Sequence, residues 1–415
     1  MQPLTGVDIR APRRAPIFLV VCVSSTWPRA RVRRTFTSTL IELLQLKSKS
    51  RRKNMVIYYL DSSLNYGGQE IKTLSEAAAL TARGHSITIV GRPKSKIVQH
   101  AKEMELKCRW LEMPNSLSPL AIWTLLRWIR EDQVSILHSH SAKDAWISGI
   151  AARLSGKRPT IFRTRHITTP IKHRIAYSWL PDYLVVISCA MRNSFAFEHG
   201  VDLAKIVLIT PCVDLRRFDC LPSRSTIRRE LGFSQEEFLI GMVAEFRGEK
   251  DHPTLVRAFR RVLDQVGHAK LLLAGEEGRK GAKIRDLVIQ LKLQNSVQFL
   301  GFRKDVPRIM RALDVSVLSS TREPFGQVLL EAMAAGTPVI ATRVEGPLEV
   351  IQHGDTGLLF EPGCDEALTK ALLSIHDNKK RAMQLADNAL IRVRKEYDFE
   401  RSIERLEAIY QEKAR

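Results

Sequence analysis

The chain has 415 residues, of which 44% are hydrophobic and 26% are charged, as in water-soluble globular proteins. This length indicates two domains or more, and the net charge of +21 indicates acidic partners such as phosphate groups, anionic lipid or nucleic acid. Six scattered cysteines without a Cys-x-x-Cys pair argue against a zinc site or a disulfide framework and fit a reducing cytosol.

Residues 1–54 form a basic tail that differs in composition from the rest. It holds twelve lysines and arginines against Asp8 and Glu42. Its one apolar run, residues 17–23, is far too short to span a bilayer. Three interpretations remain: a basic membrane-surface anchor, a disordered tail, or upstream sequence translated from a start codon chosen too early. We favour the last, because Met55 opens the first convincing strand, and we expect no chemistry from the tail.

From Met55 the pattern alternates between strands and helices. A strand is predicted over 55–60, a helix up to about residue 83 and a second strand over 86–90. This order indicates a parallel sheet covered by helices, in which ligands gather at the carboxyl ends of the strands. Gly67 and Gly68 lie at such an end, where bare backbone amides before a helix can meet a phosphate or a sugar. A simple turn is the alternative.

Two histidines end the next predicted strand, residues 134–140, which follows a predicted helix over 118–132. His138 and His140 are two residues apart, so both side chains should point to one side of that strand. A neutral imidazole there could hydrogen-bond a sugar hydroxyl or accept a proton. A structural role for the pair is the alternative.

A cationic group follows the predicted strand 160–166. Arg163, Arg165 and His166 lie at its end, and Lys172, His173 and Arg174 come shortly after. Such a cluster at the mouth of the first domain suits a phosphorylated or lipid-linked acceptor. A solvated basic loop is the alternative. Strands over 183–188 and 205–210 are expected to complete this domain, residues 55–215.

A second domain is expected over residues 216–395. Strands are predicted over 238–246, 270–275, 297–301, 314–318 and 338–342, with helices between them. The stretch from about residue 365 is helical and charged, and no transmembrane helix or internal repeat is found.

The stretch 319–338, SSTREPFGQVLLEAMAAGTP, predicts a loop followed by a helix. The hydroxyls of residues 319–321 could cap the helix, Pro324 suits its first turn, and Gly336 ends it. Glu323 and Glu331 are eight residues apart, about 12 Å at helical rise and roughly the span from sugar to ribose in a nucleotide-sugar. The unpaired amides of Phe325, Gly326 and Gln327 would favour a phosphate. Two glutamates on an ordinary amphipathic helix are the alternative.

This stretch closely resembles the donor-site signature of retaining glycosyltransferases of family 4. The resemblance continues over 340–368 (IATRVEGPLEVIQHGDTGLLFEPGCDEAL), and weaker matches reach back to Met55. It implies the GT-B fold, two Rossmann-like parallel-sheet domains facing each other across a cleft. Residues 55–215 would bind the acceptor, residues 216–395 the nucleotide-sugar, and a final helix, residues 396–415, would pack back on the first domain.

The resemblance also implies roles for single residues. Glu323 would contact the transferred sugar, Glu331 the ribose hydroxyls and the amides of residues 325–327 the diphosphate. His140, with His138 as second choice, would lie close to the anomeric carbon. The glycine pair at 67–68 matches the Gly-Gly-x-Glu loop of the family.

Two positions depart from the family pattern. Pro211 and Cys212 replace the usual Asn-Gly at the domain junction. Relatives usually carry arginine five residues before the lysine that corresponds to Lys250, where this chain has Glu245. We predict that Arg247 and Lys250 form the cationic clamp on the diphosphate, with Glu245 turned aside or paired with Arg247.

The resulting hypothesis is a cytoplasmic, metal-independent retaining glycosyltransferase that uses a nucleotide-diphosphate sugar and no other cofactor. Metal independence follows from the absence of any Asp-x-Asp pair. The acceptor would be a glycan or lipid-linked glycan, with peripheral contact to an anionic inner membrane as an option. The segments HSHSAKDAW and TRHITTP resemble enzymes of bacterial surface-glycan and lipopolysaccharide-core assembly.

Three other functions compete with this hypothesis. A family member that binds nucleotide-sugars without transfer is the main alternative. A dinucleotide-dependent oxidoreductase is remote, because the glycines of GEEGRKG (275–281) are spaced G-x-x-G-x-x-G. Nucleic-acid binding is disfavoured, because basic residues are not interleaved with aromatic ones and no binding module is recognisable.

Overall fold

The computed structural model describes residues 54–414, apart from Tyr66 and residues 167–174. The chain divides into two units, Met1–Lys53 and Asn54–Arg415, and the second is described below. The predicted basic tail, Cys22 and the cationic residues Lys172, His173 and Arg174 therefore lie outside the described residues. Among the helices that are described, none is long and apolar enough to cross a membrane.

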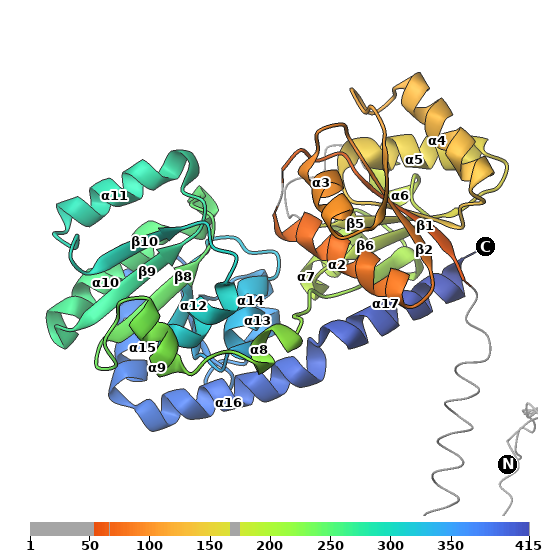
Figure 1. Cartoon of the computed structure of the whole chain (residues 1–415). Helices are drawn as coiled ribbons and strands as arrows, with labels where there is room; N and C mark the ends of the chain where they lie inside the picture. The colour runs from red at the N-terminus through yellow and green to blue at the C-terminus, as the bar shows by residue number, and fades with distance from the viewer. Residues whose placement is uncertain (1–53, 66, 167–174, 415) are drawn as a thin grey trace, which may run out of the picture. The chain divides into compact units, whose positions relative to one another are not determined.

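The first part of the chain forms a seven-stranded parallel sheet in the order β3-β2-β1-β4-β5-β6-β7 (Figure 1). Its strands are β1 (Val56–Asp61), β2 (Ser86–Gly91), β3 (Lys107–Trp110), β4 (Ile136–Ser139), β5 (Thr160–Arg165), β6 (Tyr183–Val186) and β7 (Ile206–Leu208). The central strands are buried on both faces, as expected where helices cover a parallel sheet. Strand β3 was not predicted, because its four edge residues are exposed or half-buried and lack an apolar pattern.

Helices join these strands in sequence. They are α2 (Gly68–Ala82), α3 (Lys96–Glu103), α4 (Pro119–Glu131), α5 (Ala142–Leu154), α6 (Ile175–Ser178), α7 (Cys189–Asn193) and the π-helical turn η1 (Ser194–Glu198). A short turn, η2 (Leu203–Lys205), leads into β7. The helix predicted to end at about residue 83 and the helix predicted over 118–132 are confirmed as α2 and α4.

The second part forms a six-stranded parallel sheet in the order β10-β9-β8-β11-β12-β13. Its strands are β8 (Phe238–Val243), β9 (Ala269–Ala274), β10 (Val297–Gly301), β11 (Val315–Leu318), β12 (Val339–Thr342) and β13 (Leu358–Phe360). Its helices and turns are α8 (Arg216–Asp219), α9 (Arg224–Glu230), η3 (Gly248–Lys250), α10 (His252–Val266), η4 (Gly278–Lys280), α11 (Gly281–Gln290), α12 (Val306–Ala312), α13 (Gln327–Ala334), α14 (Glu345–Val350), α15 (Asp365–Asp377) and α16 (Lys379–Glu396). The prediction missed β13, which is only three residues long.

Each sheet reverses its strand order once, and this reversal indicates where a ligand is expected to bind. The order runs outward in both directions from the β1–β4 pair in the first sheet and from the β8–β11 pair in the second. In open parallel sheets ligands bind beyond the carboxyl ends of the strands at such a switch point. Here those ends are Asp61 and Ser139 in the first sheet, and Val243 and Leu318 in the second.

The last helix, α17 (Phe399–Lys413), joins the core of the first sheet rather than that of the second (Figure 1). Phe399, Ile403, Leu406 and Tyr410 recur at helical spacing and are all buried there. Arg83 at the end of α2 forms ion pairs with Glu400 and Glu407 of α17, at 3.0 Å each. Apolar burial and these ion pairs therefore both hold α17 against the first domain.

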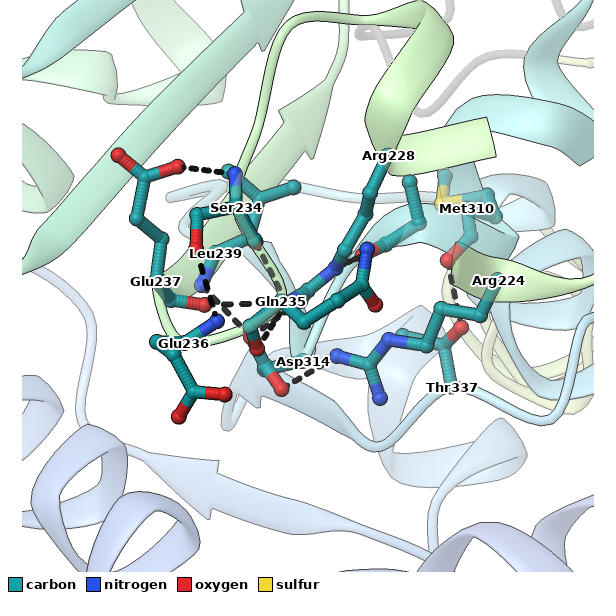
Figure 2. A network of polar contacts seen from close by, with 11 residues as sticks. Arg224, Arg228, Ser234, Gln235, Glu236, Glu237, Leu239, Met310, Asp314 and Thr337 are labelled. Carbon is teal, nitrogen blue, oxygen red and sulfur yellow. Dashed lines mark hydrogen bonds and ion pairs between the residues drawn. The ribbon is translucent and has the colours of Figure 1, made fainter. Parts of the chain in front are cut away.

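A buried arginine ties α9 to the amino-terminal edge of the second sheet (Figure 2). Arg228 is 2% exposed and its guanidinium contacts a carboxylate oxygen of Asp314 at 2.5 Å. Its remaining donors reach the carbonyl oxygens of Ala312, Ser234, Gln235 and Glu237. Asp314 also accepts from the amide of Leu239 and from Arg224. Every polar group of this network has a partner, which fits a structural role.

Candidate functional site

The loop after β11 brings a carboxylate against a lysine. Lys250 Nζ, at the end of η3, lies 2.5 Å from Glu323 Oε2, and the Ser320 hydroxyl donates to the same oxygen at 3.1 Å. The Glu323 side chain is 9% exposed, so this ion pair lies in a largely dry environment where charge interactions are strong. The structure thus brings together two residues, 73 positions apart in sequence, that were both predicted for the donor site.

The helix of the donor stretch begins later than predicted. Gly326 is the N-cap residue of α13, so Pro324 precedes the helix and Glu323 lies in the loop. The hydroxyls of residues 319–321 do not cap α13. Ser319 donates to the carbonyls of Lys250 and Asp251, Ser320 donates to Glu323, and Thr321 donates to the carbonyl of Glu249. These predictions were wrong because the hydroxyls fasten the loop to the η3 turn instead.

Two glycines shape this loop, and one of them was not predicted. Gly326 has φ = 90°, in the left-handed region that favours glycine, and a Cβ there would crowd Leu329 and Leu318. Gly346, in α14, donates its N–H to the carbonyl of Glu323 at 3.0 Å. A Cβ on Gly346 would come within 2.4 Å of the Phe325 backbone. The sequence signal that could have indicated Gly346 is the Gly-Pro pair at 346–347, because this pair marks the start of a helix that packs closely.

Glu331 lies in α13, and with Gln327 it lines a pocket of about 440 Å³. Across that pocket are Lys72 and Ser75 of α2, together with Arg217 of α8. The Glu331 carboxylate is 4.0 Å from the Arg217 guanidinium. Burial raises the pKa of Glu331, and the charge of Arg217 counteracts part of that rise. Phe325, in contrast, is 2% exposed, so only its backbone can serve a ligand.

Glu245 and Arg247 form an ion pair of 2.7 Å, which is one of the two arrangements predicted for Glu245. Both side chains are about half exposed, and both residues lie beyond the end of β8. The hydrogen bond from Arg247 to Glu245 raises the pKa of Arg247. The role of Arg247 in a diphosphate clamp stays a prediction.

The glycine pair after β1 begins helix α2, with Gly67 as its N-cap residue. The N–H of Gly67 donates to Glu70 Oε2 at 2.8 Å, so the prediction of a bare amide is wrong for Gly67. Gly68 is the first helical residue, and the space where a Cβ would stand is open. The amide of Gly67 is therefore occupied within the helix cap, whereas no side chain crowds the backbone of Gly68.

The two histidines at the end of β4 stack on the same side of the sheet, as predicted, but in different environments. Their ring centroids are 4.6 Å apart. His138 is 2% exposed, and its two nitrogens contact the Tyr410 hydroxyl of α17 and the Thr164 hydroxyl. His138 is thus held entirely by protein groups, which fits the structural alternative and leaves no ring nitrogen for an acceptor.

His140 follows the last residue of β4 and is 7% exposed. Its Nδ1 lies 3.2 Å from Nε2 of His166, while its own Nε2 has no partner among the described residues. Burial, and then the positive charge of Lys72, lower the pKa of His140 to about 3. The pKa values of His138 and His166 are also lowered by burial. His140 therefore stays neutral at physiological pH with one buried nitrogen free to bond a ligand.

The arginines of β5 turn inward rather than toward an acceptor. Arg163 is 4% exposed, stacks over the Tyr177 ring at 3.7 Å and donates to the carbonyl of Ala176. Arg165 donates to the Tyr177 hydroxyl. The prediction of a surface cationic cluster is wrong for Arg163, because β5 is an inner strand with both faces covered.

Two buried acids of this site were not predicted. Asp61 is the last residue of β1 and Asp144 lies in the first turn of α5, and they are 1% and 0% exposed. The capping-box spacing from Ser141 to Asp144 could have indicated Asp144. An aspartate ending a buried strand at the predicted ligand edge could have indicated Asp61.

Comparisons with known proteins were made for the whole chain. Residues 66–217 match the family described as Glycosyltransferase Family 4, and residues 223–392 match Glycosyl transferases group 1. The N-acetyl-alpha-D-glucosaminyl L-malate synthase of Bacillus anthracis is 35% identical over 303 residues, covering 68% of this chain and 75% of that protein. An Escherichia coli UDP-Gal:alpha-D-GlcNAc-diphosphoundecaprenol alpha-1,3-galactosyltransferase is 25% identical over 291 residues, covering 66% of this chain and 73% of that protein.

Solved structures share the fold. A glycosyltransferase of Rickettsia africae superposes with a TM-score of 0.80 at 23% identity, covering 87% of this chain and 98% of the other. The Anabaena protein HepE, in complex with UDP and glucose, superposes with a TM-score of 0.77 at 21% identity, covering 86% of this chain and all of the other. The two parallel sheets are thus the two Rossmann-like domains of the GT-B fold, and the chain belongs to the family 4 glycosyltransferases.

Proposed function

We propose that this glycosyltransferase moves a sugar from a nucleotide-diphosphate donor to a glycan or lipid-linked glycan, with retention at the anomeric carbon and without a metal ion. The observation that carries this proposal is the Lys250–Glu323 ion pair beside the start of α13. Lysine and helix amides suit the diphosphate, while the glutamate suits sugar hydroxyls.

Transfer would rest on positioning and electrostatics. As the bond to the diphosphate breaks, Lys250 and the backbone amides at Gly326 and Gln327 would stabilise the leaving group. Lys250 would then exchange its contact with Glu323 for the phosphate, which frees Glu323 to bind the sugar. The unpartnered Nε2 of neutral His140 would bond the sugar from the other domain.

A uridine diphosphate sugar is the donor we propose. HepE was solved with UDP and glucose, and the Escherichia coli relative is named for UDP-Gal. Glu331 would hold the ribose hydroxyls from the pocket that it lines with Gln327. The base itself would stack on α13 and its neighbours. The sequence identifies no residue that would contact the base specifically.

The acceptor class follows from charge and from relatives. The basic tail accounts for +10 of the net charge of +21, so the rest of the chain still carries +11, which favours an anionic acceptor or an anionic membrane surface. The Escherichia coli relative acts on a diphosphoundecaprenol-linked sugar, as its name states. We therefore propose a phosphate-bearing glycan or glycolipid, used at the cytoplasmic side of a membrane.

A donor screen tests the proposal. The full chain is heated with UDP-, GDP-, ADP- and dTDP-sugars, since a ligand at 100 times its dissociation constant adds about 2.7 kcal/mol of stability. A shift with UDP-sugars alone supports the donor, and no shift with any of them contradicts it.

The hit is then assayed for transfer. Activity should persist in EDTA, and a loss that magnesium or manganese restores would overturn metal independence. The configuration of the new bond, read by proton NMR during the first turnovers, tests retention. Inversion would contradict it.

A further inference from the structure

Asp144 holds the turn that carries His140. Its Oδ2 accepts hydrogen bonds from the backbone amides of His140 and Ser141, each at 3.0 Å. Its Oδ1 lies 3.2 Å from the Ser62 hydroxyl, in the loop after β1. One carboxyl group therefore fixes the backbone on which His140 stands and joins it to the neighbouring loop.

Asp61 holds the same turn from the other side. Its Oδ1 accepts from the amide of Ser63 at 2.8 Å and from the hydroxyl of Ser141 at 3.0 Å. Its Oδ2 accepts from the side-chain amide of Gln69, in the first turn of α2 after the glycine pair, at 2.9 Å. Both acids thus bond to Ser141 and connect the glycine loop with the His140 turn.

The two acids are close together, buried and without a cationic partner. Within the described part of the chain, neither forms an ion pair, and the bonds just named come from hydroxyls and amides. Two buried carboxylates in one site repel each other, and the usual outcome is that one keeps a proton. Burial and then the charge of Asp61 raise the pKa of Asp144 to about 7, and burial raises the pKa of Asp61.

We propose that Asp61 and Asp144 share one proton and that the protonated pair positions His140 and the glycine loop for transfer. Both act as positioning residues, since their carboxyl oxygens bond to hydroxyls and amides of the protein. This inference rests on the proposed function for its link to transfer, whereas the shared proton rests on the burial and the hydrogen bonds of the two carboxyl groups.

The surrounding groups accommodate the proton. A proton on Asp144 Oδ1 can be donated to the Ser62 hydroxyl, because a hydroxyl both donates and accepts, and Oδ2 continues to accept both amides. The charge of Arg163, from β5, opposes the rise in the pKa of Asp144, and the neighbouring His140 is neutral. Loss of the proton above about pH 7 places a second negative charge beside Asp61. We expect the two loops to separate and transfer to slow.

Asp144→Asn tests the proton and keeps the shape of the side chain. The new carbonyl oxygen can replace Oδ2, and the new NH2 can donate to the Ser62 hydroxyl as the protonated oxygen would. Asp144→Ala should lower kcat about 100-fold, with the KM for the donor changed less than threefold, and Asp144→Asn should recover at least tenfold of that loss at pH 6. From pH 6 to 8.5 kcat should fall in the wild type and stay level in Asp144→Asn. Asp286→Asn, the same change on the exposed face of α11, is the control and should match the wild type.

Two measurements on the full chain need no substrate. At pH 6 the infrared spectrum of the wild type minus that of Asp144→Asn should show the carbonyl band of a protonated carboxyl group, while bands common to both proteins, such as one from buried Glu331, cancel. Between pH 4 and 7 the folded state should hold a proton that the unfolded state has lost. The unfolding equilibrium constant of the wild type should therefore rise with pH, by up to about tenfold per unit relative to Asp144→Asn.

Each result decides the inference. An absent band in the infrared difference spectrum, or parallel pH profiles of unfolding, overturns the shared proton even if transfer is never observed. Asp144→Asn as inactive as Asp144→Ala at every pH overturns the positioning role. If Asp144→Asn does not fold, Asp61→Asn gives the same readouts, because Gln69 can turn its side-chain carbonyl toward the new NH2.

Discussion

The arginine network before β11 and the histidine cluster at the end of β4 are both buried polar clusters. They differ in whether their polar atoms have hydrogen-bond partners. Arg228 spreads its donors over Asp314 and four carbonyl groups (Figure 2). In the histidine cluster, Nε2 of His140 and Nε of Arg163 have no partner within the part of the chain that the structure describes. The first cluster lies at the amino-terminal edge of its sheet and the second at the carboxyl-terminal edge.

The comparison separates a cluster whose polar atoms are paired from one that holds unpaired atoms at the proposed ligand edge. An unpaired buried polar atom costs roughly 1 to 3 kcal/mol, so each one calls for an explanation, and at this edge the explanation we propose is a ligand that pairs with it. The lowered pKa values of His138, His140 and His166 and the raised value of Asp144 belong to the same edge. Stability and transfer should therefore respond to different substitutions.

The largest effect on stability should come from Arg228→Met. The substitution leaves Asp314 and four carbonyl groups without their main donor, and we expect a loss of roughly 3 to 5 kcal/mol in the free energy of unfolding. Urea denaturation measures it, and kcat of the folded fraction should be unchanged. Arg224→Met, at a side chain 41% exposed, is the matched control and should cost less than about 1 kcal/mol. Equal losses for both variants would contradict the comparison.

Lys250→Ala should have the opposite profile. Loss of the cation proposed to face the diphosphate should lower kcat/KM by roughly one to three orders of magnitude, equivalent to about 1.4 to 4 kcal/mol. The free energy of unfolding should fall less than in Arg228→Met, because Lys250 is partly exposed and Ser320 still donates to Glu323. Arg247→Ala is the companion variant, and a loss in the same range supports a clamp of two cations. An unchanged Arg247→Ala enzyme would leave Lys250 to act alone.

Acidification should weaken the histidine cluster. The pKa of His140 is lower in the folded protein than the ordinary value of 6.5. Below pH 6.5 His140 is therefore protonated in the unfolded chain but stays neutral in the folded chain. Stability should fall by about 1.4 kcal/mol per pH unit from this group, or about 2 kcal/mol by pH 5. Comparing unfolding curves of the wild type and His140→Asn at several pH values isolates the contribution of His140 to the pH dependence of stability. His268→Asn, at an exposed histidine, should leave the slope unchanged.

Glu331→Ala and Glu323→Ala should separate binding from transfer. Removing Glu331 should weaken nucleotide binding about tenfold, because hydrogen bonds to a charged group are lost. Removing Glu323 should mainly slow kcat, because its proposed contact is with the transferred sugar. Calorimetry with UDP and steady-state kinetics with the donor measure the two effects. Wild-type constants for both variants would contradict the donor-site assignment.

Glu245→Arg should have the smallest effect. Glu245 pairs with Arg247 at a half-exposed position, where ion pairs contribute less than about 1 kcal/mol. Replacing it with arginine frees Arg247 and adds a cation near the diphosphate, so donor affinity should stay equal or rise up to about fivefold. Isothermal titration with the donor checks this, and a clear loss of affinity would show that Glu245 itself serves the ligand.

The sequence predicted most of the two sheets because their inner strands are apolar runs between helical segments. It failed where that signal is absent, at the exposed edge strand β3 and at the three-residue β13. It also placed the start of the donor helix before Pro324, since proline and hydroxyl residues ordinarily mark a first turn. The left-handed Gly326 moved that start to Gln327.

For the site, Glu323, Glu331, Lys250 and His140 stay predictions, which rest on residue types, on spacing and on the resemblance to the family. Only the tertiary structure decided which of them are paired: Glu323 with Lys250, Arg247 with Glu245, and His138 with Tyr410 from the far end of the chain. It alone buried Arg163 and placed Asp61 beside the turn that Asp144 holds. The physical reason is that segments far apart in sequence pack together only in the folded chain. Their packing decides how buried each side chain is and which partners it has, and burial and partners in turn set its pKa and leave some of its hydrogen-bonding atoms free.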